Sequence, residues 1–142
     1  MASIRDVWTS ANNVIRSARQ IINEQLRPLG LSSAEGNILL HMLMSPENRY
    51  QEQLVTQLDI SKGAVSRAVD SLVDKGYLHR EKASHDKRFT QLHLSDKAQA
   101  LSMEIEKIYT GLYMRAIENI SENEFKTLIS ILNRVSKNLT SD

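Results

Sequence analysis

Apolar residues recur at helical spacing along most of this chain, and polar, proline and glycine positions separate them into successive elements. The first stripe runs without interruption over residues 4–26 and predicts one long helix, which should end at Pro28–Gly30. Ser32 and Glu35 then form a capping-box pattern, in which each side chain can bond the other's backbone. A second helix is therefore expected from this point to a stop before Pro46.

Two short helices are expected next. The first covers residues 51–58, Asp59 and Ile60 form the turn, and Ser61 caps the second, which should end at Gly76 in a left-handed cap. The residues that would pack the two helices together are Leu54, Leu58, Ile60, Val65 and Val69. A tight turn between two helices whose inward faces pack together is typical of a helix-turn-helix.

A β-hairpin and two more helices complete the pattern. Residues 77–80 and 89–94 alternate in polarity and predict two antiparallel strands around a polar loop. Ser95 is expected to cap one long fifth helix with a single apolar stripe over residues 98–116, and a capping box at Ser121–Glu124 predicts the last helix. The expected fold class is mainly α with a small β-hairpin wing.

Positive charge is concentrated in the segment that holds the helix-turn-helix pattern. The whole chain carries a net charge of +1, whereas residues 61–95 carry seven Lys and Arg against four Asp and Glu, a local charge of +3. The flanking segments 1–60 and 96–142 each carry −1. This asymmetry suits a nucleic-acid partner. Because affinity grows with the number of phosphates neutralised, a charge of +3 favours a dimer that would double it.

The predicted recognition helix follows Ser61. With its apolar face buried, its first turn should enter the major groove. Lys62 can reach a phosphate or guanine, and Arg67 is the best candidate for the two acceptors of guanine. The full candidate set is Ser61, Lys62, Gly63, Ala64, Ser66, Arg67 and Ser71. The alternative is an amphipathic helix with an ordinary solvated face, and the hairpin that follows argues against it.

The loop between the strands supplies a second candidate set, Lys82, Ser84, Asp86, Lys87 and Arg88. Arg88 lies near the loop tip, where a guanidinium can enter the narrow minor groove with its enhanced negative potential. Asp86 can pair with Arg88 and hold it in one orientation. Lys82, Ser84 and Lys87 are expected at phosphates. An ordinary polar loop is the alternative, and it is stronger for Lys87 than for the Asp86–Arg88 pair.

These motifs resemble the MarR family of winged helix-turn-helix transcriptional regulators, and the resemblance covers essentially the whole chain. The residues that carry it are Leu54, Ile60–Arg67, Leu72, Lys75–Leu78, Arg80 and Asp86–Ser95. The last segment fits the family's Asp-x-Arg-x5-Leu-Thr pattern, with Ser95 in the final place. Val55 and Ala98 depart from the residues usual at their positions, but neither changes a candidate contact residue.

The resemblance implies an obligate homodimer that binds a pseudo-palindromic operator, with recognition helices in successive major grooves and wings in flanking minor grooves. It implies an N-terminal dimerisation helix (1–30), a winged helix-turn-helix DNA-binding lobe (31–95) and C-terminal dimerisation helices (96–142). Many relatives are repressors released by a small, often phenolic or anionic, ligand. We therefore expect a homodimeric, ligand-responsive transcriptional repressor that binds double-stranded DNA.

Apolar surface also favours a dimer. The first and the last two helices carry more of it than a small winged domain can cover, and the residues concerned include Ile4, Val7, Trp8, Leu132, Val135 and Leu139. Burial against a second copy in a two-fold symmetric interface would cover them. One intramolecular helical bundle is the alternative.

A small-molecule effector is expected from the resemblance, in a cleft between the dimer helices and the winged lobe. The candidate lining residues, chosen by coarse position, are Trp8, Arg16, Arg19, Met42 and Tyr109. Core packing of Trp8 and Met42, and ordinary surface arginines, are the alternatives.

No cofactor and no metal site are expected. The four histidines are scattered, and His79 with His93 falls short of the three or four ligands that zinc prefers. A site of His41 with Glu24 and Glu35 is kept as an alternative, because some relatives bind zinc through His and Glu on the equivalent helices.

Several function classes are excluded or disfavoured. The absence of cysteine excludes disulfides, thiolate metal sites and thiol-based redox sensing. A cytoplasmic protein is expected, because no apolar run is long enough to span a membrane and the N-terminus does not resemble a secretion signal. No nucleophile lies beside a general base, so an enzyme is not expected. A module that binds a protein partner instead of DNA is the second hypothesis, and the basic wing argues against it.

Overall fold

The computed structural model describes residues 1–47 and 49–141. The elements in chain order are α1 (Ile4–Leu26), the 3₁₀ turn η1 (Arg27–Leu29), α2 (Ser33–Met44), α3 (Gln51–Gln57), α4 (Lys62–Asp74), β1 (Leu78–Lys82), β2 (Thr90–Leu94), α5 (Asp96–Ala100), α6 (Ser102–Ala116) and α7 (Glu122–Thr140). They fall into two compact units, Met1–Tyr109 and Thr110–Asp142. The three functional segments expected from the resemblance stay a prediction.

The capping residues confirm the helix boundaries expected before the hairpin. Ser32 Oγ accepts from the Glu35 amide at 3.2 Å, and Glu35 Oε1 accepts from the Ser32 amide at 3.1 Å, which begins α2. Gly30 and Gly76 adopt left-handed backbone angles, with φ of 71° and 82°, where the preceding helices end. A further capping box at the start of α1, between Ser3 and Asp6, was not predicted.

The expectation of one long fifth helix is wrong. The segment divides into α5 and α6, and the break falls at Leu101. The Leu101 amide bonds the Ala98 carbonyl, three residues back, at 3.1 Å, so the backbone tightens there instead of continuing the four-residue pattern. Ala98 and Ile105, on either side of the break, are both fully buried.

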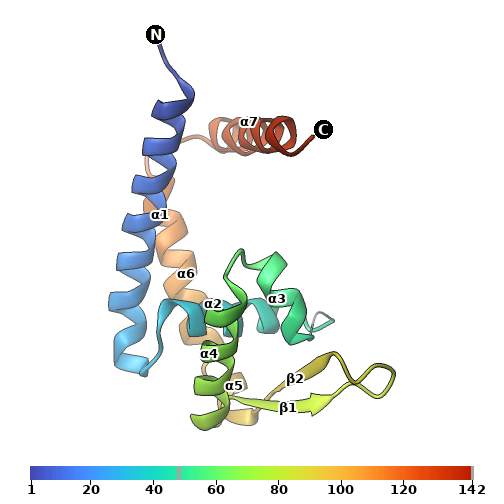
Figure 1. Ribbon diagram of the computed structural model, residues 1–142. Coiled ribbons are helices and arrows are strands. Elements are labelled where there is room, and N and C mark those ends of the chain that lie inside the picture. Colours follow the sequence, from blue (N-terminus) through green and yellow to red (C-terminus); the bar gives the residue numbers. More distant parts are fainter. Residues whose placement is uncertain (48, 142) are drawn as a thin grey trace. The chain divides into compact units, whose positions relative to one another are not determined.

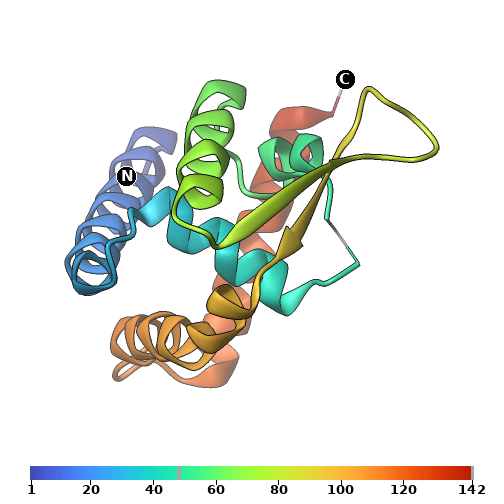
Figure 2. The ribbon, with the colours of Figure 1, turned by 90° about the horizontal axis from the view of Figure 1, so that it is seen from below.

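The two strands of the hairpin are antiparallel, as expected. Leu78 lies opposite Leu94 and Lys82 opposite Thr90, so β1 runs two residues further than predicted. Figures 1 and 2 show that the loop joining the strands extends beyond the helices of the first unit. The molecule is mainly helical with one small wing, as expected.

The core of the first unit lies where α2, α4 and the hairpin meet, with α1 and α3 alongside (Figure 1). Its fully buried aliphatic side chains include Leu26, Ile38, Leu39, Leu54, Val65, Val69, Leu72 and Leu92. Each helix of this unit therefore presents one apolar face inward, which fixes the rotation of the helix about its axis.

Apolar side chains remain uncovered at the surface of each unit. On α1 these include Ile4 and Trp8, with 62% and 71% of their surface exposed, and on α7 Leu132 and Leu139, with 42% and 73%. Within the second unit, the rings of Tyr113 and Phe125 pack edge to face at 5.5 Å. Among the described residues, no helix has the combined length and apolar character needed to cross a membrane.

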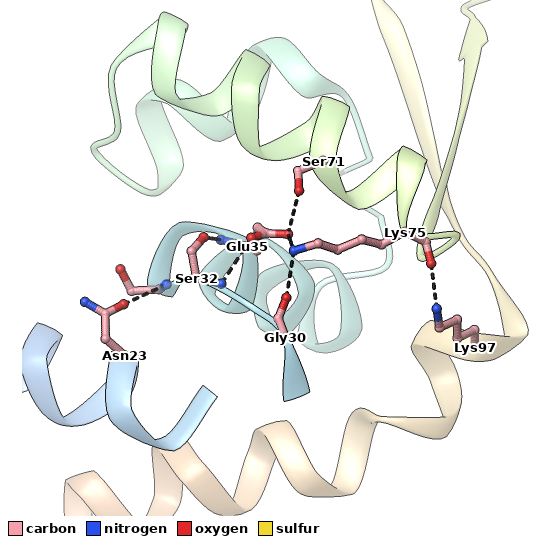
Figure 3. Close-up of polar contacts among 8 residues, drawn as sticks. Asn23, Gly30, Ser32, Glu35, Ser71, Lys75 and Lys97 are labelled. Atoms are coloured by element: carbon pink, nitrogen blue, oxygen red, sulfur yellow. Dashed lines mark hydrogen bonds and ion pairs between the residues drawn. The ribbon is translucent and has the colours of Figure 1, made fainter. Parts of the chain in front are cut away.

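A buried carboxylate fastens α4 to the first turn of α2 (Figure 3). Glu35 is only 6% exposed, and its Oε2 accepts from Lys75 Nζ at 2.8 Å and from Ser71 Oγ at 3.2 Å. Lys75 Nζ also donates to the Gly30 carbonyl at 2.7 Å. One carboxylate and one ammonium group thus join the α1–α2 corner, the start of α2 and the end of α4.

The environment of Glu35 favours its ionised form. Burial acts to raise the pKa of Glu35, but the hydrogen bonds from Lys75 and Ser32 outweigh burial and hold its pKa below the usual value. Lys97 Nζ continues the chain of contacts by donating to the Lys75 carbonyl at 2.6 Å (Figure 3). The folded protein therefore holds Glu35 as a carboxylate paired with the ammonium group of Lys75.

Replacing Glu35 should cost stability in a pH-dependent way. At pH 7, Glu35→Gln is expected to lower the free energy of unfolding by about 1–3 kcal/mol, because Lys75 keeps its charge and loses its ionised partner. Since the pKa of Glu35 is lower in the folded state, its ionised form stabilises the fold above the ordinary pKa of about 4.3. That contribution is lost as the pH falls through the folded pKa, so the two proteins should converge in urea unfolding at acid pH.

The matched control is Glu24→Gln, which neutralises an exposed carboxylate on α1. Its free energy of unfolding should stay within about 0.5 kcal/mol of the unaltered protein. Equal stability of Glu35→Gln and the unaltered protein at pH 7 would contradict the assignment.

Candidate nucleic-acid interface

The start of α4 is set by a side-chain cap. Ser61 Oγ accepts from the Ala64 amide at 3.1 Å, as expected, and Asp59 turns the chain before it with a left-handed φ of 51°. On the inner side, Val65, Ala68, Val69 and Leu72 are buried. Burial of these four residues directs the opposite face of the helix to solvent.

The residues predicted for the first two turns of α4 lie on that solvent side. Ser61, Lys62, Gly63 and Arg67 are exposed, and Ala64 and Ser66 are half-buried. A Cβ at Gly63 would lie 3.2 Å from Arg67 Nη1, so the missing side chain gives the guanidinium room. Two cations and a bare stretch of backbone therefore stand together at a capped helix start, which is an arrangement suited to the major groove.

The structure separates Ser71 from this group. Ser71 is half-buried, and its hydroxyl donates to Glu35 Oε2 inside the lobe. Its position two turns further along α4 places it in the cluster of Figure 3. The observed contact of Ser71 is thus an internal one, with the carboxylate of Glu35.

The wing loop holds its arginine in a defined orientation. Arg88 Nε and Nη2 donate to the two oxygens of Asp86 at 3.1 and 2.8 Å, and the Arg88 amide donates to Asp86 Oδ1 at 3.0 Å. The predicted pairing of these residues is confirmed. Hydrogen bonds from Arg88 lower the pKa of Asp86, and the same carboxylate raises the pKa of Arg88.

The remaining wing candidates are at the surface. Lys82, Ser84 and Lys87 are exposed, and the Arg88 side chain keeps 86% of its surface open to solvent despite its ion pair. Asp86, the partner, is half-buried. The loop therefore presents its cations outward and keeps its acid behind them.

Further contacts tie the hairpin to the helices, and they were not predicted. Arg80 of β1 forms an ion pair with Asp70 of α4. The Thr90 amide of β2 donates to both carboxylate oxygens of Glu52 on α3. These partners lie ten and 38 residues apart in the chain, and neither pair belongs to a periodic pattern or a local cap. No signal in one sequence could have paired them.

The five predicted ligand-pocket residues do not converge. Met42 is 1% exposed in the core, whereas Trp8 is exposed near the start of α1. Tyr109 donates its hydroxyl to Asn37 Oδ1 at 2.6 Å, and burial raises the pKa of Tyr109. Arg16 and Arg19 alone lie together.

Arg16 and Arg19 line an open groove along α1, together with Arg27 and the amides of Asn12 and Asn23. The groove is formed by one helix face and its 3₁₀ extension. Its lining includes three guanidinium groups and one carboxylate, that of Glu24, so positive charge is in excess.

Three of the residues considered for a metal, His41, Glu35 and His93, have other partners. His41 Nε2 lies 2.7 Å from Gln57 Oε1, which fits the expectation of a satisfied imidazole. Glu35 is engaged by Lys75. His79 and His93 are direct neighbours across the hairpin, and His93 Nε2 lies 3.0 Å from Glu81 Oε2. In residues 1–47 and 49–141, no three His, Asp or Glu side chains gather as a metal site would require.

Solved structures share this fold across nearly the whole chain. A MarR transcriptional regulator from Methanosarcina mazei Go1 is 22% identical with a TM-score of 0.78, and the match covers 93% of this chain and 94% of that one. A protein from Listeria monocytogenes, described as a MarR-family regulator and complexed with a 26-mer DNA, is 24% identical with a TM-score of 0.81 and coverage of 98% and 89%. A mutant of the E. coli MarR protein, complexed with operator DNA, is 24% identical with a TM-score of 0.78 and coverage of 93% and 94%.

At these identities the likeness establishes the winged-helix fold. The family model described as the MarR family matches residues 29–88, which include α2, the helix-turn-helix and the wing up to Arg88. This segment contains most of the motifs that carried the resemblance, with the capped α4 and the Asp86–Arg88 pair in place. The resemblance to the MarR family of transcriptional regulators is thereby confirmed over residues 29–88, and the likeness in fold extends over nearly the whole chain.

Proposed function

We propose that this protein is a homodimeric, sequence-specific DNA-binding regulator of transcription, acting as a repressor that a small ligand releases. Helix α4 enters the major groove of a pseudo-palindromic operator, and the wing enters the flanking minor groove. One observation carries the proposal: a single compact unit contains both the capped start of α4, with Lys62 and Arg67 exposed, and a wing loop that orients Arg88.

The roles of the DNA-contacting residues follow from their chemistry. Arg67 reads guanine through a two-pronged hydrogen bond, and the backbone at Gly63 and Ala64 approaches the groove closely. Arg88 lies in the minor groove, where its guanidinium meets the enhanced negative potential. Phosphate contacts come from Lys62, Lys82, Ser84 and Lys87, with Ser61 and Ser66 beside them. Asp86 orients Arg88. Ser71 contributes indirectly, through its bond to Glu35.

Two similar structures support a DNA partner, because those proteins were crystallised with DNA, and in one case with operator DNA. The local charge of +3 supports it as well, since the excess lies over residues 61–95, which contain α4 and the wing. A second copy doubles that charge and presents two recognition helices to successive grooves.

The dimer is supported by uncovered apolar surface. Trp8 on α1 and Leu139 on α7 each expose more than two-thirds of their surface in the single copy. Large apolar side chains gathered at a surface mark an interaction site, and a symmetric interface buries them in both copies at once.

The most detailed part of the proposal is that a small ligand controls DNA binding. Its support is the groove lined by Arg16 and Arg19 of α1 and Arg27 of η1, where three guanidinium groups outnumber the one carboxylate of Glu24 and suit a small anion such as a phenolate or carboxylate. Titrating such anions against the DNA complex tests it, and unaltered DNA affinity with all of them would remove ligand control from the proposal.

Two substitutions separate base reading from phosphate binding. Arg67→Ala is expected to reduce discrimination at one base pair by about 1–3 kcal/mol, because the guanine contact is lost. Lys87→Ala should instead weaken all duplexes alike and lower the slope of log affinity against log salt by about 1 per wing. The measurement is fluorescence anisotropy at several salt concentrations, with a duplex selected from a random library and its single-base variants.

The exposed Lys137 of α7 lies outside the proposed interface, so Lys137→Ala serves as the charge-matched control. Unchanged affinity and base preference in Arg67→Ala would refute the assignment of that residue. Failure of the unaltered protein to bind any duplex at low salt would refute the proposed function as a whole.

The oligomeric state gives an independent test. Analytical ultracentrifugation at micromolar concentration should show a dimer, and Trp8→Glu should shift it to monomer, because an ionised group cannot be buried unpaired in an interface. Ser17→Glu adds the same charge at an exposed polar position of α1 and should leave the dimer intact. A stable folded monomer of the unaltered protein would contradict the dimer.

A further inference from the structure

We infer that Glu52 is a positioning residue for DNA binding: it fastens the wing to the start of α3 and so fixes where Arg88 stands relative to the recognition helix. The inference rests on the proposed function for its DNA consequence. The fastening itself is a property of the free protein.

The outer edge of β2 carries the attachment. In an antiparallel pair, every second amide points away from the partner strand. In this hairpin, the Thr90 amide donates to Glu52 Oε1 at 3.0 Å and Oε2 at 3.1 Å, and the Leu92 amide donates to the Arg49 carbonyl at 2.6 Å. The segment that opens α3 thus takes up two successive outward donors of the strand. The bond to Glu52 is charge-assisted, which makes it the stronger kind.

Aromatic packing places the loop over the same attachment. The ring of Tyr50, the residue before α3, meets the ring of His85 edge-on at 5.8 Å and that of Phe89 at 6.0 Å. His85 and Phe89 stack on each other at 6.5 Å. Both lie in the wing loop, on either side of the Asp86–Arg88 pair. The residues that precede and open α3 therefore contact the wing at its strand and at its loop.

This attachment provides what the Asp86–Arg88 pair lacks. That pair fixes the guanidinium relative to the loop, because both residues belong to the loop. A two-stranded hairpin is marginally stable by itself, so its tip needs another element to hold its place. Helix α3 packs against α4, and Glu52 extends from α3 to β2. The carboxylate therefore couples the position of the wing to that of the recognition helix.

The negative charge of Glu52 allows its positioning role to be separated from simple electrostatics. Glu52 is exposed, and it lines the same surface hollow as Lys62 and Ser66, on the side proposed to face DNA. An acidic group there repels phosphates, so electrostatics alone predicts that removing it strengthens binding. If Glu52 instead positions the wing, removing its carboxylate should weaken DNA binding.

The experiment compares Glu52→Ala with Glu52→Gln and with the control Glu47→Ala, which removes an exposed carboxylate five residues earlier. DNA affinity is measured by anisotropy on a duplex selected by the unaltered protein. Glu52→Ala should weaken binding about fivefold or more, the scale of one lost charge-assisted hydrogen bond. Glu52→Gln removes the same charge but keeps an amide oxygen for Thr90, so it should retain more affinity. Glu47→Ala should bind as well as the unaltered protein or better.

Two readouts separate positioning from a general loss of structure. In an Arg88→Ala background, Glu52→Ala should cost clearly less affinity than in the unaltered protein, because Arg88 is already absent and only the phosphate contacts of the wing remain to be misplaced. In the free protein, the Thr90 amide should exchange with deuterium about tenfold faster in Glu52→Ala, while amides in the core of α4 keep their rates.

Three outcomes would each overturn the inference. Glu52→Ala could bind DNA more strongly, it could lose as much affinity in the Arg88→Ala background as in the unaltered protein, or it could leave the deuterium exchange of the Thr90 amide unchanged. Absence of any DNA binding by the unaltered protein would instead refute the proposed function and the DNA consequence with it. The exchange measurement would then still decide whether Glu52 holds the wing.

Discussion

Burial of one face of α4 determines which side chains the helix presents to solvent. Val65, Ala68, Val69 and Leu72 remove that face from water, so the rotation of the helix is fixed by the largest favourable term in folding. The Ser61 cap fixes where the helix starts. Together these two facts decide which side chains meet solvent, and they place Lys62 and Arg67 at the same exposed helix start. The candidate chemistry of the surface is thus a consequence of the core beneath it.

Carboxylates do most of the remaining positioning in the first unit. Glu35 holds the end of α4, Glu52 holds the edge of β2, Asp70 pairs with Arg80 and Asp86 orients Arg88. Asp70 and Asp86 lie within the segment proposed to bind a polyanion, and Glu52 lines a hollow with Lys62 and Ser66 of that segment, so each of the three acids reduces the attraction. Their repeated use shows that this surface is organised for the placement of its cations more than for their number.

Local patterns predicted the parts of the fold that local chemistry decides. Some of these features join residues at most three apart, namely the capping boxes at Ser32 and Ser121 and the Asp86–Arg88 pair. Another, the left-handed Gly76, depends on the backbone preference of a single residue. The exposed face of α4 followed from helical periodicity alone. These features are confirmed because the interacting groups are already neighbours in the sequence.

What the sequence could not indicate depends on contacts between distant segments. Glu35 and Lys75 lie 40 residues apart, and Glu52 and Thr90 lie 38 apart, so no period or motif joins them. Helical periodicity predicts Ser71 among the DNA-contacting residues because it is a polar residue outside the apolar stripe, but such a position can face either solvent or a buried carboxylate. The break at Leu101 was missed for a similar reason: an apolar stripe fits a continuous helix and a tightened one equally well.

A small positive charge makes geometry decisive for the proposed function. Each copy offers a surplus of only +3 over residues 61–95, so the non-specific attraction to DNA is limited and must be supplemented by well-placed contacts. In a dimer that reads two half-sites, an error in the angle between wing and recognition helix is repeated in both copies, and both grooves then lose contacts together. Rigid attachment of the wing therefore contributes twice to every bound complex. The need for rigid attachment accounts for the acidic side chains that individually oppose phosphate binding and yet lie within the surface that we propose contacts DNA.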